Sequence, residues 1–561
     1  MKVSEIKYKR LTIEEISARA ASIIERVKLA NSVPEILKAR DEYVELLKEF
    51  TTASSLSFMR YTINTVDEFY LKEKDYYDEI TPKVQDFQRE FAAAMLQSPY
   101  RAELEQELLP LLFRLYEAQE RSVSPAVVED MVEENKMITE YSQLMAGMTF
   151  NFRGEDIPLT ILRRYMQDDD RETRRVAYEV LGRQLESDSD KLDGIYDRLV
   201  RVRDTMAKKM GYKNFVELGY YRMSRISFDR EQIEEFRANV LKHLVPAVAR
   251  LKKENAALMG IDKFMLYDND VNLPDGNPKP VSDKQGIFDA AKKMYRNMSD
   301  TTGEFFDMML ETDAFDVESR KNKWGGGYCI DFPSYRQPFI LANFNGTADD
   351  IGVITHEAGH ALADYLTADN RFAHDLRYGS ETAEVHSMSM EFLTWKYMDL
   401  FFGEGAEKHK FSHLFDALTF IPYGTIVDYF QHIVYEHPTL TPAERKREWN
   451  KLEAQFRPYL STQGIPYLSE GTRWQYQMHI YEIPFYYIDY CLAQTVALQF
   501  LIESRKDYAG AFEKYLALVR RGGEMRFTEL IAEAGLRSPF EEETIKQLAQ
   551  DVESLVKELR G

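Results

Sequence analysis

Apolar residues recur every three or four positions through most of the first 147 residues. This spacing is the period of an amphipathic helix, and it is clearest in "TIEEISARAASIIERVKLA", "VPEILKARDEYVELLKEF" and "PAVVEDMVEENKMITEYSQLMAG". It returns in "DRETRRVAYEVLGRQLES" and "SFDREQIEEFRANVLKHLVPAVARLKKENAALMG". A stretch rich in Pro, Asn and Asp at 267–283 then interrupts it. The pattern predicts a mostly helical protein.

Two segments have the pattern of β-structure. "MTFNFRGEDIPL" predicts a small hairpin around Arg153 and Gly154. "GGGYCIDF" and "QPFILANF" predict two strands, and "NGTADD" then leads into a helix. Thr347 is the expected N-cap of that helix, with Asp350 as an acidic residue in its first turn. We therefore expect one small sheet beside this helix.

Length, charge and cysteine content narrow the class of protein. At 561 residues the chain exceeds the size of one growing core, so two or more lobes are expected. The formal net charge of −21 argues against nucleic-acid binding, which requires a basic stripe. No apolar run approaches the roughly 18 residues of a membrane span, and the charged start does not resemble a signal peptide, so a cytoplasmic protein is expected. Cys329 and Cys491 are too few for a disulfide framework or a thiolate metal site.

The predicted helix contains "HEAGH". His356 and His360 are one turn apart, so both imidazoles project from the same side of the helix and can bind one zinc ion. Glu357 points about 100 degrees further round, where it can reach a water molecule on that ion. Gly359 is unfavourable inside a helix and indicates close approach by another backbone or a ligand. The alternative is a solvated helix face.

A catalytic zinc needs a third protein ligand. "SETAEVHSMSMEFLTWKYM" predicts a second helix capped by Ser380. Glu381, Glu384 and Glu391 form an acidic stripe along it, and Glu384, at the centre of the stripe, is the predicted ligand.

Three other residues of this region have open roles. His386 leaves the helix about 200 degrees from Glu384, and His374 lies in a predicted loop. Both are alternative ligands. Glu391 is expected to orient a ligand histidine through its free ring N–H, or else to be a surface carboxylate.

These motifs resemble one family of zinc peptidases. "HEAGH", "EVHSMSMEF", "GGGYC", "PFILANFNGT", "MHIYEIPFYYIDY" and "MAKKMGYKNFVELGYYRM" are similar to segments of the thimet oligopeptidase and oligoendopeptidase F family, most closely its bacterial oligoendopeptidase F branch. The resemblance covers roughly residues 190 to 545. It therefore divides the chain into an N-terminal helical lobe, 1–190, and a zinc-peptidase region, 191–561. Ala363 departs from the family, where many members have a histidine that is not a zinc ligand.

The resemblance implies a fold and a mechanism. Two mostly helical lobes would enclose a deep channel that admits short peptides. One zinc ion per chain would be held by His356, His360 and Glu384. Glu357 would be the general base and proton shuttle.

The family places a histidine and tyrosines from "MHIYEIPFYYIDY" over the zinc, which implies catalytic roles for His479, Tyr486 and Tyr490. In a helix these three side chains lie within about 40 degrees of one another, whereas Tyr487 points about 100 degrees from Tyr486. Pro484 can instead begin the helix and leave His479 on the preceding loop. The alternative reading is an aromatic core stripe.

Two segments are candidates for peptide binding. The strand "PFILANF", with Ala342 and Asn343, could pair an exposed edge with an extended substrate, or it could be paired internally. In "GGGYC", Gly326, Gly327 and Tyr328 could belong to a loop over the cleft or to a tight turn.

The sequence therefore predicts a zinc endopeptidase that hydrolyses internal bonds of short peptides by metal-activated water. We find no G-x-S-x-G elbow and no cysteine in a nucleophile signature, so covalent hydrolysis has no candidate. A zinc exopeptidase and a non-catalytic helical peptide-binding protein are the alternatives. The expected partners are short peptides, with no nucleic acid and no membrane.

Overall fold

The computed structural model describes residues 1–370 and 379–560, most of which lie in helices. The N-terminal helices are α1 (Ile13–Leu29), α2 (Val33–Ile63), α3 (Glu68–Leu96), α4 (Arg101–Leu108), α5 (Pro110–Ser122) and α6 (Val128–Gly147). The next are α7 (Leu159–Met166), α8 (Arg171–Ser187), α9 (Ser189–Lys209), α10 (Phe215–Arg222), α11 (Arg230–Asn239), α12 (Val245–Leu258), α13 (Lys284–Met298) and α14 (Asp300–Glu311). The last are α15 (Asp349–Thr367), α16 (Ser380–Leu393), α17 (Asp399–Phe402), α18 (Ala406–Glu436), α19 (Pro442–Phe456), α20 (Met478–Glu482), α21 (Tyr487–Lys506), α22 (Tyr508–Arg521), α23 (Phe527–Glu533) and α24 (Glu542–Arg560). The predicted mostly helical class is confirmed.

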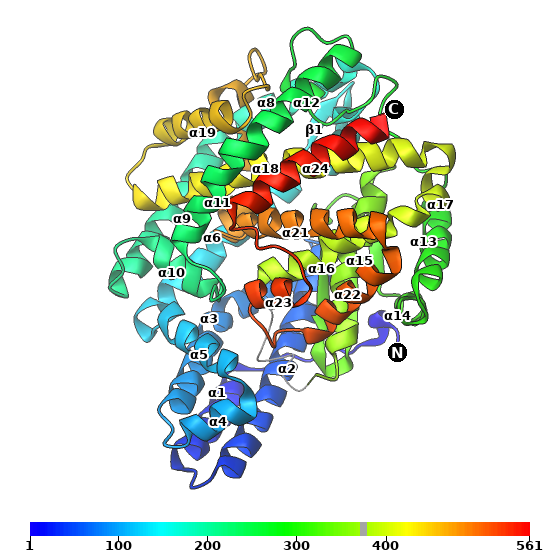
Figure 1. Ribbon diagram of the computed structural model, residues 1–561. Helices are drawn as coiled ribbons and strands as arrows, with labels where there is room; N and C mark the ends of the chain where they lie inside the picture. The colour runs from blue at the N-terminus through cyan, green and yellow to red at the C-terminus, as the bar shows by residue number, and fades with distance from the viewer. Residues whose placement is uncertain (371–378, 561) are drawn as a thin grey trace.

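The helices bury two apolar cores. One core is formed by α1 to α5 and includes Ile23, Phe91 and Leu112. The other is much larger and extends from α6 through α15, α16 and α21 to α24. Figure 1 shows α1 and α4 at one end of the molecule, α8, α12 and α19 at the other, and α15, α16 and α21 between them. The division at residue 190 stays a prediction.

The predicted hairpin is confirmed. β1 (Phe150–Phe152) pairs antiparallel with β2 (Glu155–Ile157). The two connecting residues, Arg153 and Gly154, have φ angles of 55° and 88°. Positive φ at both positions is characteristic of the type I′ turn, whose twist matches that of the strands.

A second sheet lies beside α15, with strand order β3-β5-β4. β4 (Tyr328–Phe332) and β5 (Gln337–Phe344) are the two predicted strands, and they pair antiparallel. β3 (Phe315–Glu318) was not predicted, and it pairs parallel to β5. β5 is therefore the central strand, and the prediction of an exposed edge on "PFILANF" was wrong. The edge strands of this sheet are β3 and β4.

The turn between β5 and α15 differs from the predicted cap. α15 begins at Asp349, and the hydroxyl of Thr347 accepts a 3.3 Å hydrogen bond from its backbone N–H. The carboxylate of Asp350 turns back to accept from the N–H groups of Asn345 (2.9 Å) and Gly346 (2.8 Å). Asp350 thus fixes the direction in which the chain enters the helix.

α15 and α16 touch backbone to backbone. A Cβ atom at Gly359 would lie 2.6 Å from Ser387 Cα and 2.7 Å from the carbonyl oxygen of His386, so only glycine fits. The expected close approach at Gly359 is therefore confirmed. Ser380 is the first residue of α16 rather than its cap, and its hydroxyl donates to Asp489 Oδ2 at 2.8 Å.

Candidate metal centre

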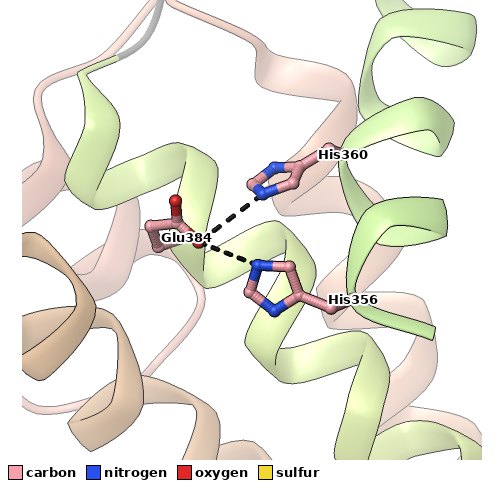
Figure 2. Close-up of side chains that lie close together, drawn as sticks. All are labelled: His356, His360 and Glu384. Atoms are coloured by element: carbon pink, nitrogen blue, oxygen red, sulfur yellow. Dashed lines mark ion pairs between the residues drawn. The ribbon is translucent and has the colours of Figure 1, made fainter. Parts of the chain in front are cut away.

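Three side chains from α15 and α16 converge on one point. The nearest ligand atoms of His356, His360 and Glu384 all lie within 4.8 Å of one another. Glu384 Oε2 is 3.2 Å from His356 Nε2 and 3.5 Å from His360 Nε2. Figure 2 shows both histidine rings pointing from α15 toward Glu384 on α16. The one-turn spacing on α15 aims both rings at α16, and the Gly359 contact brings Glu384 within reach.

The other ring nitrogen of His356 faces Glu391. His356 Nδ1 lies 2.7 Å from Glu391 Oε1. With its proton on Nδ1, the ring presents the lone pair of Nε2 to the cluster, which is the arrangement of a metal ligand and its orienting carboxylate.

The electrostatics of the cluster favour a cation. Glu384 is almost wholly buried, which would raise its pKa, but His360 and His356 outweigh burial and hold it well below the ordinary value. Two imidazole nitrogens and a carboxylate oxygen are a donor set that zinc accepts readily. The residues present therefore fit a zinc ion.

Glu357 lies beside this cluster but is not part of it. Its side chain is 8% exposed, and burial raises its pKa despite the nearby His356 and His360. Adding a Cβ atom to Gly327, just before β4, would place that atom 3.5 Å from Glu357 Oε1. The carboxylate thus occupies the space between α15 and β4.

Two cavities meet at His356 and Glu357. The β4 cavity, of about 500 Å³, is lined by β4 together with His360, Glu384, Tyr486 and Tyr490. The α18 cavity, of about 520 Å³, is lined by the α18 residues His409, Ser412, His413 and Asp416 and by Glu391, Arg457 and Arg473. A peptide that occupied both cavities would therefore lie against His356 and Glu357.

The segment "MHIYEIPFYYIDY" contributes to the β4 cavity. It folds as α20, which contains His479, followed by a break at Ile483–Tyr486 and then α21. The hydroxyl of Tyr486 donates to Glu384 Oε1, and that of Tyr490 lies 3.4 Å from His479 Nε2. His479 is thus on a short helix of its own, neither on a loop nor on α21, which contains Tyr490 and has Tyr486 as its N-cap.

Two protein-family profiles match this chain. A profile described as Peptidase M3 N-terminal domain matches residues 3–123, and one described as Peptidase family M3 matches residues 164–550. The chain belongs to peptidase family M3.

Individual M3 relatives agree. The solved structure of PZ peptidase A with inhibitor 2 is 42% identical to this chain, with a TM-score of 0.97 and coverage of 99% of both chains. Oligopeptidase PepF of Bacillus subtilis is 21% identical over 384 residues, which are 66% of this chain and 55% of that protein. The oligoendopeptidase F homolog of Borreliella burgdorferi is 24% identical over 277 residues, 47% of this chain and 45% of that protein. The chain thus spans about half the length of these two curated relatives. The resemblance drawn from the sequence is confirmed.

Two residues of β5 that were expected to bind the peptide, Ala342 and Asn343, have other contacts. Ala342 is 1% exposed on the central strand, and its carbonyl accepts from Lys323 Nζ. Asn343 donates to the carbonyl oxygens of Trp324 (2.9 Å) and Gly326 (2.8 Å), so it secures the glycine loop. Neither residue lines the β4 cavity or the α18 cavity. A peptide-binding role for them has no support in these contacts.

The residues of the glycine loop differ in whether they line the β4 cavity. Gly326 packs against the indole of Trp324, where an added Cβ atom would overlap the ring. Gly327 and Tyr328 line the β4 cavity. The Tyr328 hydroxyl is 2.6 Å from that of Thr62 on α2, which ties the loop to the N-terminal helices.

His386, one of the two alternative metal ligands, is not part of the cluster. His386 is completely buried on the opposite side of α16, and burial lowers its pKa to about 3. His374 lies outside the described residues. Ala363 is completely buried in the core.

One residue near the site was missed. Gln477 Nε2 lies 3.0 Å from His479 Nδ1, and the Tyr423 hydroxyl donates to Gln477 Oε1 at 2.9 Å. This amide orientation leaves the proton of neutral His479 on Nε2. Gln477 lies two residues before His479, but no sequence pattern distinguishes it from other polar residues.

Among the helices that the structure describes, none has the length and apolar character that a membrane span requires.

Proposed function

We propose that this protein is a zinc-dependent endopeptidase that hydrolyses internal bonds of short oligopeptides. The observation that carries the proposal is the convergence of His356, His360 and Glu384 beside Glu357, at the junction of two cavities. Zinc bound to the three ligands would lower the pKa of a coordinated water toward 7 and polarise the substrate carbonyl.

Glu357 is the proposed general base. Its carboxylate takes a proton from the attacking water as the new C–O bond forms. It then delivers that proton to the amide nitrogen as the C–N bond breaks, so no acyl-enzyme is required. Burial supports this role because it raises the pKa of Glu357 and thereby makes the carboxylate a stronger base.

Tyr486 and His479 are the proposed donors to the developing oxyanion. The Tyr486 hydroxyl lies in the β4 cavity at Glu384. Burial lowers the pKa of His479 to about 4, so at neutral pH the ring is neutral and its Nε2–H can donate. Donors aimed at that oxygen stabilise the transition state more than the ground state.

β4 is the proposed binding edge for the peptide. Its backbone groups border the β4 cavity, and among the described residues it pairs only with β5. An extended peptide could add to this edge through main-chain hydrogen bonds, with its reactive carbonyl near Glu357. Because His356 and Glu357 line both the β4 cavity and the α18 cavity, the two cavities could accommodate residues on both sides of the bond.

One observation favours a carboxypeptidase as the second candidate. Arg457 and Arg473 both line the α18 cavity, and each lies 3.3 Å from Glu453 Oε1. A single carboxylate between two guanidinium groups leaves positive charge that would suit a peptide C-terminus.

Peptides blocked at both ends separate the candidates. An endopeptidase should cut blocked peptides of about 5 to 20 residues internally, as mass spectrometry would show, since an extended strand suffices for binding. Turnover should disappear on chelation and return with zinc. Cleavage restricted to peptides with a free C-terminus would favour the carboxypeptidase, and turnover unaffected by chelation would refute both candidates.

A further inference from the structure

The carboxylate of Glu391 is held at both oxygens. Oε1 lies 2.7 Å from His356 Nδ1, and Oε2 lies 2.9 Å from Nε2 of His413. His413 is on α18, a different helix from either histidine ligand. Glu391 therefore joins a candidate metal ligand to a residue that is itself remote from the metal cluster.

The hydrogen bonds assign the proton of His413. The indole nitrogen of Trp395 donates to His413 Nδ1 at 2.8 Å. An indole N–H can only donate, so Nδ1 must accept with its lone pair. A neutral imidazole then carries its one proton on Nε2, where it faces Glu391. A doubly protonated His413 ring would place its Nδ1–H against the indole N–H of Trp395, where neither group can accept.

Packing holds this arrangement in place. The His413 ring stacks on Phe392, with centroids 4.7 Å apart and planes 13° from parallel. Phe392 and Trp395 are 2% and 5% exposed. Both follow Glu391 on the same short stretch of chain, so the carboxylate, the stacking ring and the indole donor move as one unit. Rotation of His413 would break the stack and both hydrogen bonds.

We propose that His413 and Trp395 are positioning residues for the metal centre. Trp395 fixes the tautomer of His413, His413 fixes the Glu391 carboxylate, and Glu391 fixes the His356 ring with Nε2 toward the metal. This inference rests on the proposed zinc site. Without the His413 donor, Glu391 Oε2 would lose its partner and the carboxylate could rotate away from His356. Outer hydrogen-bond partners of this kind support metal affinity as well as activity.

The test is the zinc dissociation constant of the full-length protein, measured by competition with a chromophoric chelator. His413→Phe keeps an aromatic ring for Phe392 but removes the donor. It should weaken zinc binding about 10- to 100-fold. The matched control is His409→Phe, one turn earlier on α18, where the histidine ring stacks on Phe402 at 4.0 Å and is 7% exposed. This control should bind zinc like the wild type, because no hydrogen bond joins it to Glu391 among the described contacts.

Two further variants show whether the donor matters or only the shape. His413→Gln can donate from Nε2 to Glu391 and accept from Trp395, so it should recover most of the lost affinity. Trp395→Phe keeps His413 but frees Nδ1, so its zinc affinity should lie between those of the wild type and His413→Phe. The visible spectrum of the Co²⁺-substituted protein should change in the same order, because it reports ligand geometry.

Several outcomes would overturn the inference. Native zinc affinity in His413→Phe, or equal losses in His413→Gln and His413→Phe, would remove the donor role. If thermal denaturation shows that the metal-free His413→Phe protein is not folded, the zinc affinities of Trp395→Phe and His413→Gln test the proposal instead. Native zinc affinity in Trp395→Phe would then count against the proposal. A wild-type protein that fails to bind zinc would instead overturn the proposed function.

Discussion

Glu384 and Glu391 are the same residue type on the same helix, and both contact His356, yet their surroundings differ. Glu384 is 1% exposed and faces Nε2 of both histidines, whereas Glu391 faces Nδ1 of His356 and Nε2 of His413. Burial would raise the pKa of Glu391, but the hydrogen bonds from His356 and His413 outweigh it and lower the pKa to about 2. Both carboxylates are therefore held as anions. The ring nitrogen that a carboxylate faces therefore decides whether the carboxylate can share a metal ion or only orient a ligand.

The largest effect is expected at Glu384. Glu384→Ala removes one of three ligands, so zinc content and turnover should be lost together, and added zinc should restore neither. Elemental analysis after dialysis and a peptide assay measure the two quantities. The control is His386→Ala on the opposite side of α16, which should keep its zinc. Retention of zinc in the first variant and loss in the second would reverse the ligand assignment.

Glu357 separates chemistry from metal binding. Glu357→Gln should keep stoichiometric zinc while kcat falls roughly 100- to 10,000-fold, the range of general acid–base catalysis. The amide has nearly the shape of the carboxylate but cannot take the proton. Single-turnover kinetics with zinc analysis on the same sample test this. Near-normal turnover would exclude Glu357 as the base.

The tyrosine that contacts Glu384 should affect the chemical step alone. Tyr486→Phe is expected to lower kcat by roughly 100- to 1,000-fold, the scale of losing one oxyanion donor, with little change in zinc content. Tyr487 is the matched control, because its ring packs against Phe420 and Tyr423 rather than lining the β4 cavity. Tyr487→Phe should therefore change kcat far less. Equal, small effects would assign this segment to the core.

Local patterns in the sequence were sufficient for much of this description. The helical period identified the long helices, and the two residues Arg153 and Gly154 identified a hairpin because positive φ favours such a pair. His356 and His360 could be placed together because one helical turn relates them. Glu384 could be chosen because it lies at the centre of the acidic stripe on a second predicted helix.

Pairings between distant segments could not be found in this way. β3 pairs parallel to β5 across an intervening stretch that contains β4, and nothing in "FDVE" specifies that partner. This pairing makes β5 the central strand, so its backbone edges are already paired on both sides and cannot bind a peptide. His413 contacts Glu391 from another helix, so no periodicity relates the two residues. Such contacts depend on how whole helices pack.

Saturating zinc should restore turnover after loss of the Glu391 carboxylate but not after loss of the Glu384 carboxylate. Glu391→Ala leaves the three ligands in place and is expected to weaken zinc affinity about 10- to 100-fold, so saturating zinc should restore most of the turnover. A zinc titration of activity, run beside Glu384→Ala, measures the difference. If saturating zinc rescues neither variant, Glu391 is a ligand in its own right and the distinction between the two carboxylates fails.

The smallest effect is expected at a carboxylate that lacks histidine partners. Glu482 contacts the Ser142 hydroxyl at 2.6 Å, and burial raises its pKa to about 7. The folded protein thus keeps this proton between about pH 4.5 and 7, while the unfolded chain releases it, so the contribution of Glu482 to stability falls as pH rises through that window. Glu482→Gln removes the titration. Its apparent Tm should equal or exceed that of the wild type by roughly 1–3 °C at pH 8, and the difference should shrink at pH 5. Thermal denaturation of both proteins at the two pH values measures this. The opposite trend, with the variant gaining at pH 5 and losing at pH 8, would show that Glu482 is stabilised as an anion, like Glu391.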